Sequence, residues 1–377
     1  MAAKKQVRME WLQVLRGVAA TMVFFDHVCL SEMKEFGKII SLPHFLMSGD
    51  AGVDVFFVIS GFIMLFITPQ RIDSVRGWLE FIYRRLTRIF PPYWIVFVVM
   101  FAVWLRKPEL FNNYYHNQMD VWRSFFLVPQ SFETLVGVGW TLIHELYFYF
   151  VFSALLIWGI TGRISLLIIW FGTVLLVNLL GWTEKLEGQH VLQLISSPFS
   201  LEFQLGVLIA LCYKKFNALR FAPWLCALLA IGGIVAIYGI GHFIPYVGVY
   251  PNNNHLFRVG YYGLAAFFTV FWVVQLDTAA RTIKAPHWAV LCGDASYSFY
   301  LLHGPIVVAL YKIFRSITPY PNFGIAICYD LLVIVAAFSV AILFHVKIER
   351  RLISFFHRLA VRLFKKPVNV TTGEVAA

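Results

Sequence analysis

Long apolar runs recur from one end of the sequence to the other, and they limit the fold more than any other feature. A helix that crosses the hydrocarbon core of a membrane needs about 20 mostly apolar residues. Runs of this kind lie at 10–30, 51–68, 90–105, 138–159, 164–181, 198–213, 222–240, 258–276, 288–312 and 323–345. Hydrophobic residues make up 60% of the chain and charged residues 14%, against about 45–50% and about 25% in soluble domains. The sequence therefore predicts an all-α integral membrane protein, a bundle of about ten transmembrane helices.

Basic residues are distributed unevenly between the loops on the two sides of the predicted membrane. About two thirds of the 31 Lys and Arg residues fall on the side that holds the N-terminus, and cytoplasmic loops are the ones that carry such an excess. Both termini are therefore expected to be cytoplasmic. The formal net charge of +11 then reflects positive charge retained in the cytoplasm, and no basic surface module indicates nucleic-acid binding.

The chain is expected to form one membrane domain with short extensions. The predicted parts are a cytoplasmic N-terminus at 1–9, a transmembrane domain at 10–345 and a basic cytoplasmic tail at 346–377. Residues 71–90 have helical periodicity and predict an amphipathic helix on the cytoplasmic membrane surface, which ends where Pro91 and Pro92 begin the third span. Arg16 interrupts the first apolar run, which is therefore expected to be a retained helix rather than a signal peptide. The five cysteines show no metal-binding spacing, so no metal site is expected.

Two polar residues share one face of the first span, in the stretch LRGVAATMVFFDH. Arg16 and His27 are 11 residues apart, which places them about 20° apart around a helix and about 16 Å apart along its axis. An arginine inside a span costs about 2.5–3.5 kcal/mol on insertion scales, so Arg16 needs a partner or a function. One alternative is that Arg16 reaches the membrane surface and His27 lies at the outer interface. The shared face favours a polar stripe with Arg16 toward the cytoplasm and His27 toward the outer side.

Asp54 is the predicted partner of His27. It lies near the outer end of the second span, at about the depth of the histidine. A carboxylate there can bind one imidazole nitrogen and leave the other basic. Asp26 is adjacent to His27 in sequence, but neighbouring residues of a helix point in different directions. The alternative is that Asp54 only caps the start of its helix, where carboxylates are favoured.

Two further polar residues lie inside apolar spans. Glu145 in the fourth span requires a partner, because an unpaired buried carboxylate is costly; Arg16, Arg258 or a substrate hydroxyl can supply one. His303 lies near the middle of the ninth span and is expected to be a structural histidine held by a hydrogen bond.

Arg84, Arg85 and Arg88 form a dense basic cluster beside the third span. Arginine binds phosphates through two parallel hydrogen bonds. Contact with lipid head groups also explains such a cluster without any ligand. Together with the stripe from Arg16 to His27, it indicates an acidic ligand that enters from the cytoplasm.

Several blocks of the sequence resemble acyltransferase family 3, the integral-membrane O-acyltransferases, and especially its exopolysaccharide-production subset. The spacing from Arg16 to His27 is similar to the family's signature arginine and histidine. Further blocks match in the expected order, namely GVDVFFVISGF (52–62), FIYRRLTRIFPPYW (81–94), GVGWTLIHELYFYF (137–150) and GDASYSFYLLHGP (293–305). Five blocks in order make the resemblance specific, and it covers residues from about 10 to 345.

The resemblance implies transfer of an acyl group, usually acetyl from acetyl-CoA, to a sugar hydroxyl of an exported polysaccharide or its lipid-linked precursor. It implies that His27 is the catalytic histidine and that Arg16 is required. The basic block with Arg84, Arg85 and Arg88 is then associated with CoA. Acetyl-CoA is expected as a co-substrate with no permanently bound cofactor, in the inner membrane of a bacterium, alongside membrane lipids and polysaccharide assembly proteins.

Two mechanisms and one rival function remain open from the sequence. His27, oriented by Asp54, acts either as general base toward the sugar hydroxyl or as a covalent carrier of the acyl group. The rival is a transporter or flippase for a lipid-linked sugar, because intramembrane charges also line substrate pathways. Transporters often contain internal repeats, and this chain shows none with a fixed period.

Overall fold

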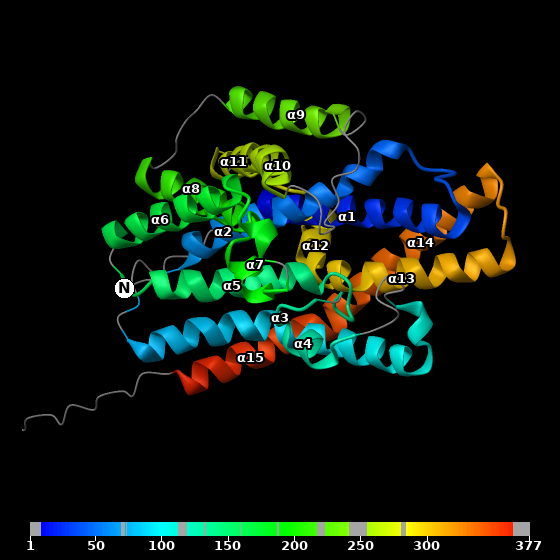
Figure 1. Cartoon of the computed structure of the whole chain (residues 1–377), viewed down its shortest axis with the longest axis horizontal. Coiled ribbons are helices and arrows are strands. Elements are labelled where there is room, and N and C mark those ends of the chain that lie inside the picture. The colour runs from blue at the N-terminus through cyan, green and yellow to red at the C-terminus, as the bar shows by residue number, and fades with distance from the viewer. Residues whose placement is uncertain are drawn as a thin grey trace, which may run out of the picture.

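The computed structural model describes residues 9–68, 72, 74–111, 119–131, 133–158, 160–186, 188–216, 223–240, 255–279 and 284–364, and these contain helices and loops but no strand. Most of the longer helices run along the long axis of the molecule, as in a bundle (Figure 1). The predicted all-α class is therefore confirmed. The predicted N-terminal segment, apart from Met9, and the end of the predicted tail from 365 lie outside the described residues.

Fifteen α-helices occupy the described part of the chain. They are α1 (Glu10–Phe36), α2 (Ala51–Ile67), α3 (Val75–Arg106), α4 (Val121–Phe126), α5 (Gly139–Leu155), α6 (Ile160–Leu179), α7 (His190–Ile195), α8 (Phe199–Phe216), α9 (Pro223–Ile240), α10 (His255–Arg258), α11 (Leu264–Ala279), α12 (His287–Asp294), α13 (Ser296–Ile317), α14 (Phe323–Phe344) and α15 (Arg350–Leu363). Two π-helical turns, Val259–Gly263 and His345–Glu349, join α10 to α11 and α14 to α15.

Eight helical segments of the described chain are long and apolar enough to cross a membrane, by length and composition. They contain α1, α2, α3, α6, α8, α11, α13 and α14. The two other predicted spans, 138–159 and 222–240, correspond to α5 and α9, and α5 has only 17 residues. The structure therefore supports a protein that crosses the membrane several times. The total of ten spans and the side of the termini stay predictions.

The predicted surface helix and the third span form one continuous helix. α3 begins after Ser74, whose hydroxyl caps its first turn, and Pro91 and Pro92 lie in its interior. The prediction that a separate surface helix ends before Pro91 is therefore wrong, and the residue at which the span begins stays a prediction. A proline removes one backbone N–H but is tolerated when other groups bind nearby carbonyls. The N–H groups missing at Pro91 and Pro92 are those that would bind the carbonyls of Thr87 and Arg88. The Tyr297 hydroxyl donates a 2.7 Å hydrogen bond to the next carbonyl, that of Ile89.

The last helices form a second continuous rod. α14 passes through the π-helical turn into α15, so the predicted boundary between 345 and 346 falls inside a helix. α15 lies beside α3 (Figure 1). Arg76 donates to the Leu363 carbonyl at 3.1 Å, and the Arg84 guanidinium lies 2.9 Å from the His357 ring. The part of the basic tail that the structure describes is thus packed against the helix that carries the arginine cluster.

The central helix α2 packs most extensively against α8, and two glycines permit this contact. A Cβ atom added at Gly61 would lie 1.9 Å from the Phe203 carbonyl oxygen, and one added at Gly206 would lie 1.9 Å from the Val58 carbonyl oxygen. Small residues let helix backbones approach closely inside membranes. The two glycines therefore set the distance between α2 and α8.

Gly206→Ala should destabilise the protein, because the added methyl group would lie 1.9 Å from the Val58 carbonyl oxygen, and the helix backbone would have to shift to make room. Overpacking typically costs about 1–3 kcal/mol, so we expect a lower midpoint of thermal unfolding in detergent. Gly172→Ala on α6 is the matched control, since nothing lies within 4 Å of its added Cβ. Equal midpoints for the two variants would contradict this account of the contact.

Candidate active site

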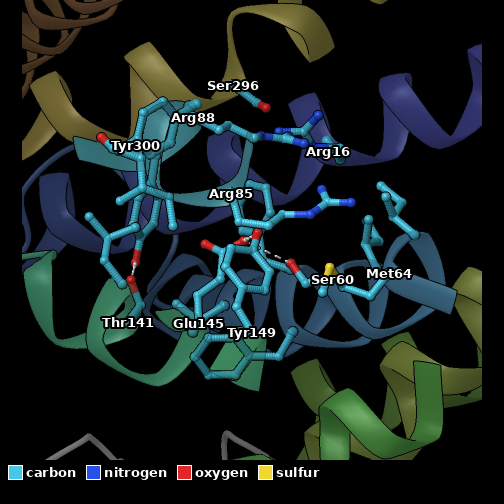
Figure 2. A pocket seen from close by; sticks show the side chains of 18 residues that line it. Arg16, Ser60, Met64, Arg85, Arg88, Thr141, Glu145, Tyr149, Ser296 and Tyr300 are labelled. Carbon is cyan, nitrogen blue, oxygen red and sulfur yellow. Dashed lines mark hydrogen bonds between the residues drawn. The ribbon is translucent and has the colours of Figure 1, made fainter. Parts of the chain in front are cut away.

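A pocket opens among α1, α2, α3, α5 and α13. Four of the residues predicted from the sequence line it: Arg16 from α1, Arg85 and Arg88 from α3, and Glu145 from α5 (Figure 2). Segments far apart in the sequence therefore bring these four side chains to one cavity. The wall also contains apolar side chains of α2, which contributes the largest part of the lining.

The three arginines of the pocket form no ion pair with a carboxylate in the described part of the chain. Arg16 donates a 3.0 Å hydrogen bond to the Gln13 amide oxygen. The Arg85 guanidinium carbon lies 5.3 Å from the centre of the Phe81 ring and 5.7 Å from that of Tyr149. Such cation–π contacts hold a guanidinium without neutralising it. The pocket therefore retains positive charge that can bind an anionic ligand.

Glu145 takes its hydrogen bonds from neutral hydroxyls. The Tyr149 hydroxyl donates to its Oε1 atom, and the Ser60 hydroxyl lies 3.4 Å from the same oxygen. The predicted partners Arg16 and Arg258 form no ion pair with it. With three arginines and one carboxylate in its wall, the pocket carries an excess of positive charge.

Arg84 lies outside the pocket, although the sequence grouped it with Arg85 and Arg88. Its Nε and Nη2 atoms donate to Glu80 Oε1 at 2.9 and 2.6 Å. Its Nη1 atom lies 2.9 Å from His357 Nδ1 on α15. The prediction that all three arginines bind one ligand is therefore corrected for Arg84, whose charge is already paired by a carboxylate one helical turn away.

His27 is paired with His303 and does not line the pocket. His27 Nδ1 lies 2.9 Å from His303 Nε2, and His303 Nδ1 lies 3.1 Å from the Phe299 carbonyl oxygen. A carbonyl only accepts hydrogen bonds, so His303 Nδ1 must carry the proton and its Nε2 must accept. His27 Nδ1 then donates, and His27 Nε2 holds the free lone pair of the neutral ring.

His303 is therefore the hydrogen-bond partner of His27, the role that the sequence predicted for Asp54. A hydrogen bond at one ring nitrogen fixes the tautomer and leaves the other nitrogen basic. His303 is fully buried, and His27 is half-buried. The prediction of a hydrogen-bonded structural histidine described His303 only in part, because its partner is the candidate catalytic residue.

Asp54 is bound to an arginine instead. Arg258 Nη2 donates to Asp54 Oδ2 at 2.6 Å, and Arg258 Nη1 donates to Asp50 Oδ2 at 2.5 Å. Both members of the Asp54–Arg258 pair are buried. The prediction that Asp54 orients His27 therefore has no support in the geometry, because an intramembrane arginine attracts the carboxylate more strongly than a neutral imidazole does.

One layer of side chains separates the pocket from the histidine pair. Tyr300 and Thr141 both line the pocket, and their hydroxyl oxygens lie 3.0 Å apart. The Tyr300 ring also contacts His303, with ring centres 5.7 Å apart. The site therefore has two neighbouring parts, a basic pocket and a histidine pair.

Comparison with known proteins assigns this two-part site to a family. A model of the acyltransferase domain matches residues 9–346. The chain belongs to this acyltransferase family. It is similar to the exopolysaccharide production protein ExoZ of Rhizobium meliloti, with 34% identity over 267 residues, which cover 69% of this chain and 77% of ExoZ. The predicted relation to acyltransferase family 3 and its exopolysaccharide-production subset is therefore confirmed.

More distant relatives of this acyltransferase are longer. Proteins of Staphylococcus aureus that are named provisionally as O-acetyltransferases are 24% identical over 326 residues, or 81% of this chain. The chain spans about half of their length (51%). No solved structure matches the chain. These relations support an O-acyltransferase that crosses the membrane several times.

Sequence reasoning missed several residues of this acyltransferase site. Tyr149, Ser296 and Tyr300 line the pocket. Arg258, which the sequence offered only as a partner of Glu145, binds two other carboxylates. A signal existed for Tyr149, because it lies one helical turn after Glu145 on the same face. Among the described residues no group of His, Cys, Asp and Glu side chains is placed to hold a metal ion.

Proposed function

We propose that the chain transfers an acetyl group from acetyl-CoA to a sugar hydroxyl of an exported polysaccharide or its lipid-linked precursor, in the bacterial inner membrane. The observation that carries this proposal is the open pocket in which Arg16, Arg85 and Arg88 form no ion pair with any carboxylate of the described residues. CoA carries several phosphates, which are the anions that arginine binds best. A CoA molecule bound there directs its long, thin thioester arm toward the histidine pair.

The proposed reaction uses His27 as general base. Its Nε2 atom takes the proton of the sugar hydroxyl, and the alkoxide oxygen attacks the thioester carbonyl carbon. The new C–O bond forms as the C–S bond breaks, and the leaving thiolate takes up the proton from His27. His303 Nε2, 2.9 Å from His27 Nδ1, accepts a hydrogen bond throughout and stabilises the transient imidazolium.

The second mechanism makes His27 a covalent carrier. His27 Nε2 attacks the thioester carbonyl and the thiolate leaves. The sugar hydroxyl oxygen then attacks the acyl carbon, the C–N bond to His27 breaks, and the hydroxyl proton passes to the thiolate, which restores the neutral imidazole. Both mechanisms need the lone pair on Nε2. They differ in whether an acyl-enzyme forms before the sugar arrives.

The proposal is tested by the release of free thiol. Purified protein in proteoliposomes, supplied with acetyl-CoA, should release CoA thiol when the polysaccharide acceptor is added. NMR of the polysaccharide should show O-acetyl groups in a complemented strain and none in a deletion strain. Translocation of a lipid-linked sugar without thiol release would instead favour the transporter.

Arg88 and Arg84 offer a matched pair of substitutions on one helix. Arg88→Gln should raise the KM for acetyl-CoA by about tenfold or more, because a hydrogen bond to a charged phosphate is worth about 1.5–3 kcal/mol. Arg84→Gln should leave this KM unchanged, because Arg84 is outside the pocket and paired with Glu80. Steady-state kinetics of the two variants measure both values. An equal rise in the KM of both variants would show that this KM depends only on the total positive charge of the region and not on the place of Arg88 in the pocket.

A further inference from the structure

Ser296 is a buried hydroxyl of the pocket wall without a hydrogen-bond partner. Its side chain is 1% exposed, and its Oγ atom has no partner among the described residues. Buried hydroxyls are nearly always hydrogen-bonded, because leaving one unpaired is costly. Since Ser296 faces the pocket, a ligand there is the natural partner for its hydroxyl (Figure 2).

Ser296 is also the first residue of α13, a helix of 22 residues. The N-terminus of a helix carries a partial positive charge and presents backbone N–H groups. Phosphate groups bind such ends readily. The unpaired hydroxyl and the helix end therefore favour the same kind of ligand.

Two of the three pocket arginines point toward this end of the pocket. Arg16 and Arg88 line the same pocket as Ser296 and project toward it in the view of Figure 2. The like charges of the two guanidinium groups act on each other. Close packing brings α1 to this position. A Cβ atom added at Gly293 would lie 1.9 Å from the Gln13 carbonyl oxygen.

The part of the pocket at Ser296, Arg16 and Arg88 is called the corner below. Two carboxylates whose charges act on Arg16 are already hydrogen-bonded. Glu349 accepts a hydrogen bond from the Ser298 hydroxyl and lies 2.8 Å from His345 Nδ1. Glu145 is held by Tyr149 and does not pair with the arginines. Positive charge at the corner therefore remains available to a ligand.

The corner is too far from His27 to hold the reacting carbonyl. Arg16 and His27 are 11 residues apart on α1, which is about 16 Å along the helix axis. A tetrahedral intermediate at His27 cannot also contact Arg16. The corner is therefore suited to a remote, anionic part of the ligand.

We propose that Ser296, the N-terminus of α13, Arg16 and Arg88 form a phosphate subsite, in which the Ser296 hydroxyl donates a hydrogen bond to a phosphate group of the acyl donor. This inference rests on the proposed function for the identity of the donor. The class of ligand, a phosphate ester or diphosphate, follows from the subsite itself. Ser296 is here a binding residue that the sequence reasoning did not identify.

Binding of CoA to the full-length protein in detergent tests the subsite. Ser296→Ala should raise the Kd for CoA by about tenfold, because one charge-assisted hydrogen bond is lost. Binding of S-acetylpantetheine, which has no such phosphates, should not change. Ser316→Ala is the matched control on the same helix, since its hydroxyl donates only to the Ile313 carbonyl at 2.7 Å.

Dephospho-CoA identifies the phosphate. An equal loss of affinity for dephospho-CoA assigns the subsite to the diphosphate, and a loss confined to CoA assigns it to the 3′-phosphate; both support the subsite. An unchanged Kd for CoA, or an equal loss for S-acetylpantetheine, would overturn it.

Failure of the proposed function is distinguishable from failure of the subsite. If the wild-type protein binds no CoA, the proposed donor is wrong, and inorganic pyrophosphate becomes the probe. Pyrophosphate should then raise the unfolding temperature of the wild-type protein and not that of Ser296→Ala. An equal rise or no rise in the two proteins would overturn the subsite as well. The unfolding temperatures without ligand show whether the variant is folded.

Discussion

Replacing His27 with alanine should reduce acetyl transfer by about 10²–10⁴-fold, the usual contribution of a positioned acid–base group. The structure gives the reason, because His303 fixes the proton on His27 Nδ1 and leaves the lone pair on Nε2. Neither proposed mechanism proceeds without that lone pair. The rate of thiol release from acetyl-CoA in the presence of acceptor measures the loss.

The same variant should keep the affinity of the protein for CoA. His27 does not line the pocket, and one layer that contains Tyr300 separates it from the pocket. An unchanged Kd for CoA also shows that the variant has folded and inserted. Transfer at the wild-type rate would remove His27 from the mechanism, and a lost affinity for CoA would contradict the division of the site into two parts.

The positions of the helices were largely readable from the sequence, because an apolar run of about 20 residues has few alternatives in a membrane. Each predicted run corresponds to helical structure in the described chain. The continuity of α3 through Pro91 and Pro92 could not be predicted from the sequence. Sequence shows the missing N–H groups, but it does not show the contacts that α3 makes beside these prolines, such as the hydrogen bond from Tyr297 to the Ile89 carbonyl.

The residues of the site were easier to predict than the side chains to which they are hydrogen-bonded or paired. Charge inside an apolar run identifies Arg16 and Glu145 as costly residues that need a reason. Asp54 and His27 were predicted at a similar depth in the membrane, which suggested that they are partners. Depth does not show which neighbouring helix the side chain of Asp54 faces. The partner is Arg258, 204 residues away. One pairing could have been read locally, since Glu80 and Arg84 have the i, i+4 spacing of a helical ion pair.

Two positions on α1 belong to different parts of the site. Arg16 belongs to the pocket with Arg85 and Arg88, and His27 belongs to the histidine pair. The 11-residue spacing is therefore a distance between a binding group and a reacting group. It fits a donor whose anionic part and reactive part are linked by an extended arm.

Arg258→Met should lower the midpoint of thermal unfolding in detergent by about 10 °C, since removing one member of a buried ion pair costs about 3–5 kcal/mol. The variant leaves the carboxylates of Asp50 and Asp54 buried without their guanidinium, and like charges then repel. The triple variant Arg258→Met, Asp50→Asn, Asp54→Asn removes the charges together and should recover most of the stability. It should also keep acetyl transfer, because His303, not Asp54, is hydrogen-bonded to His27. A triple variant that is stable but inactive would return Asp54 to the catalytic group, and a stable single variant would show that the Arg258 pairs contribute little to the fold.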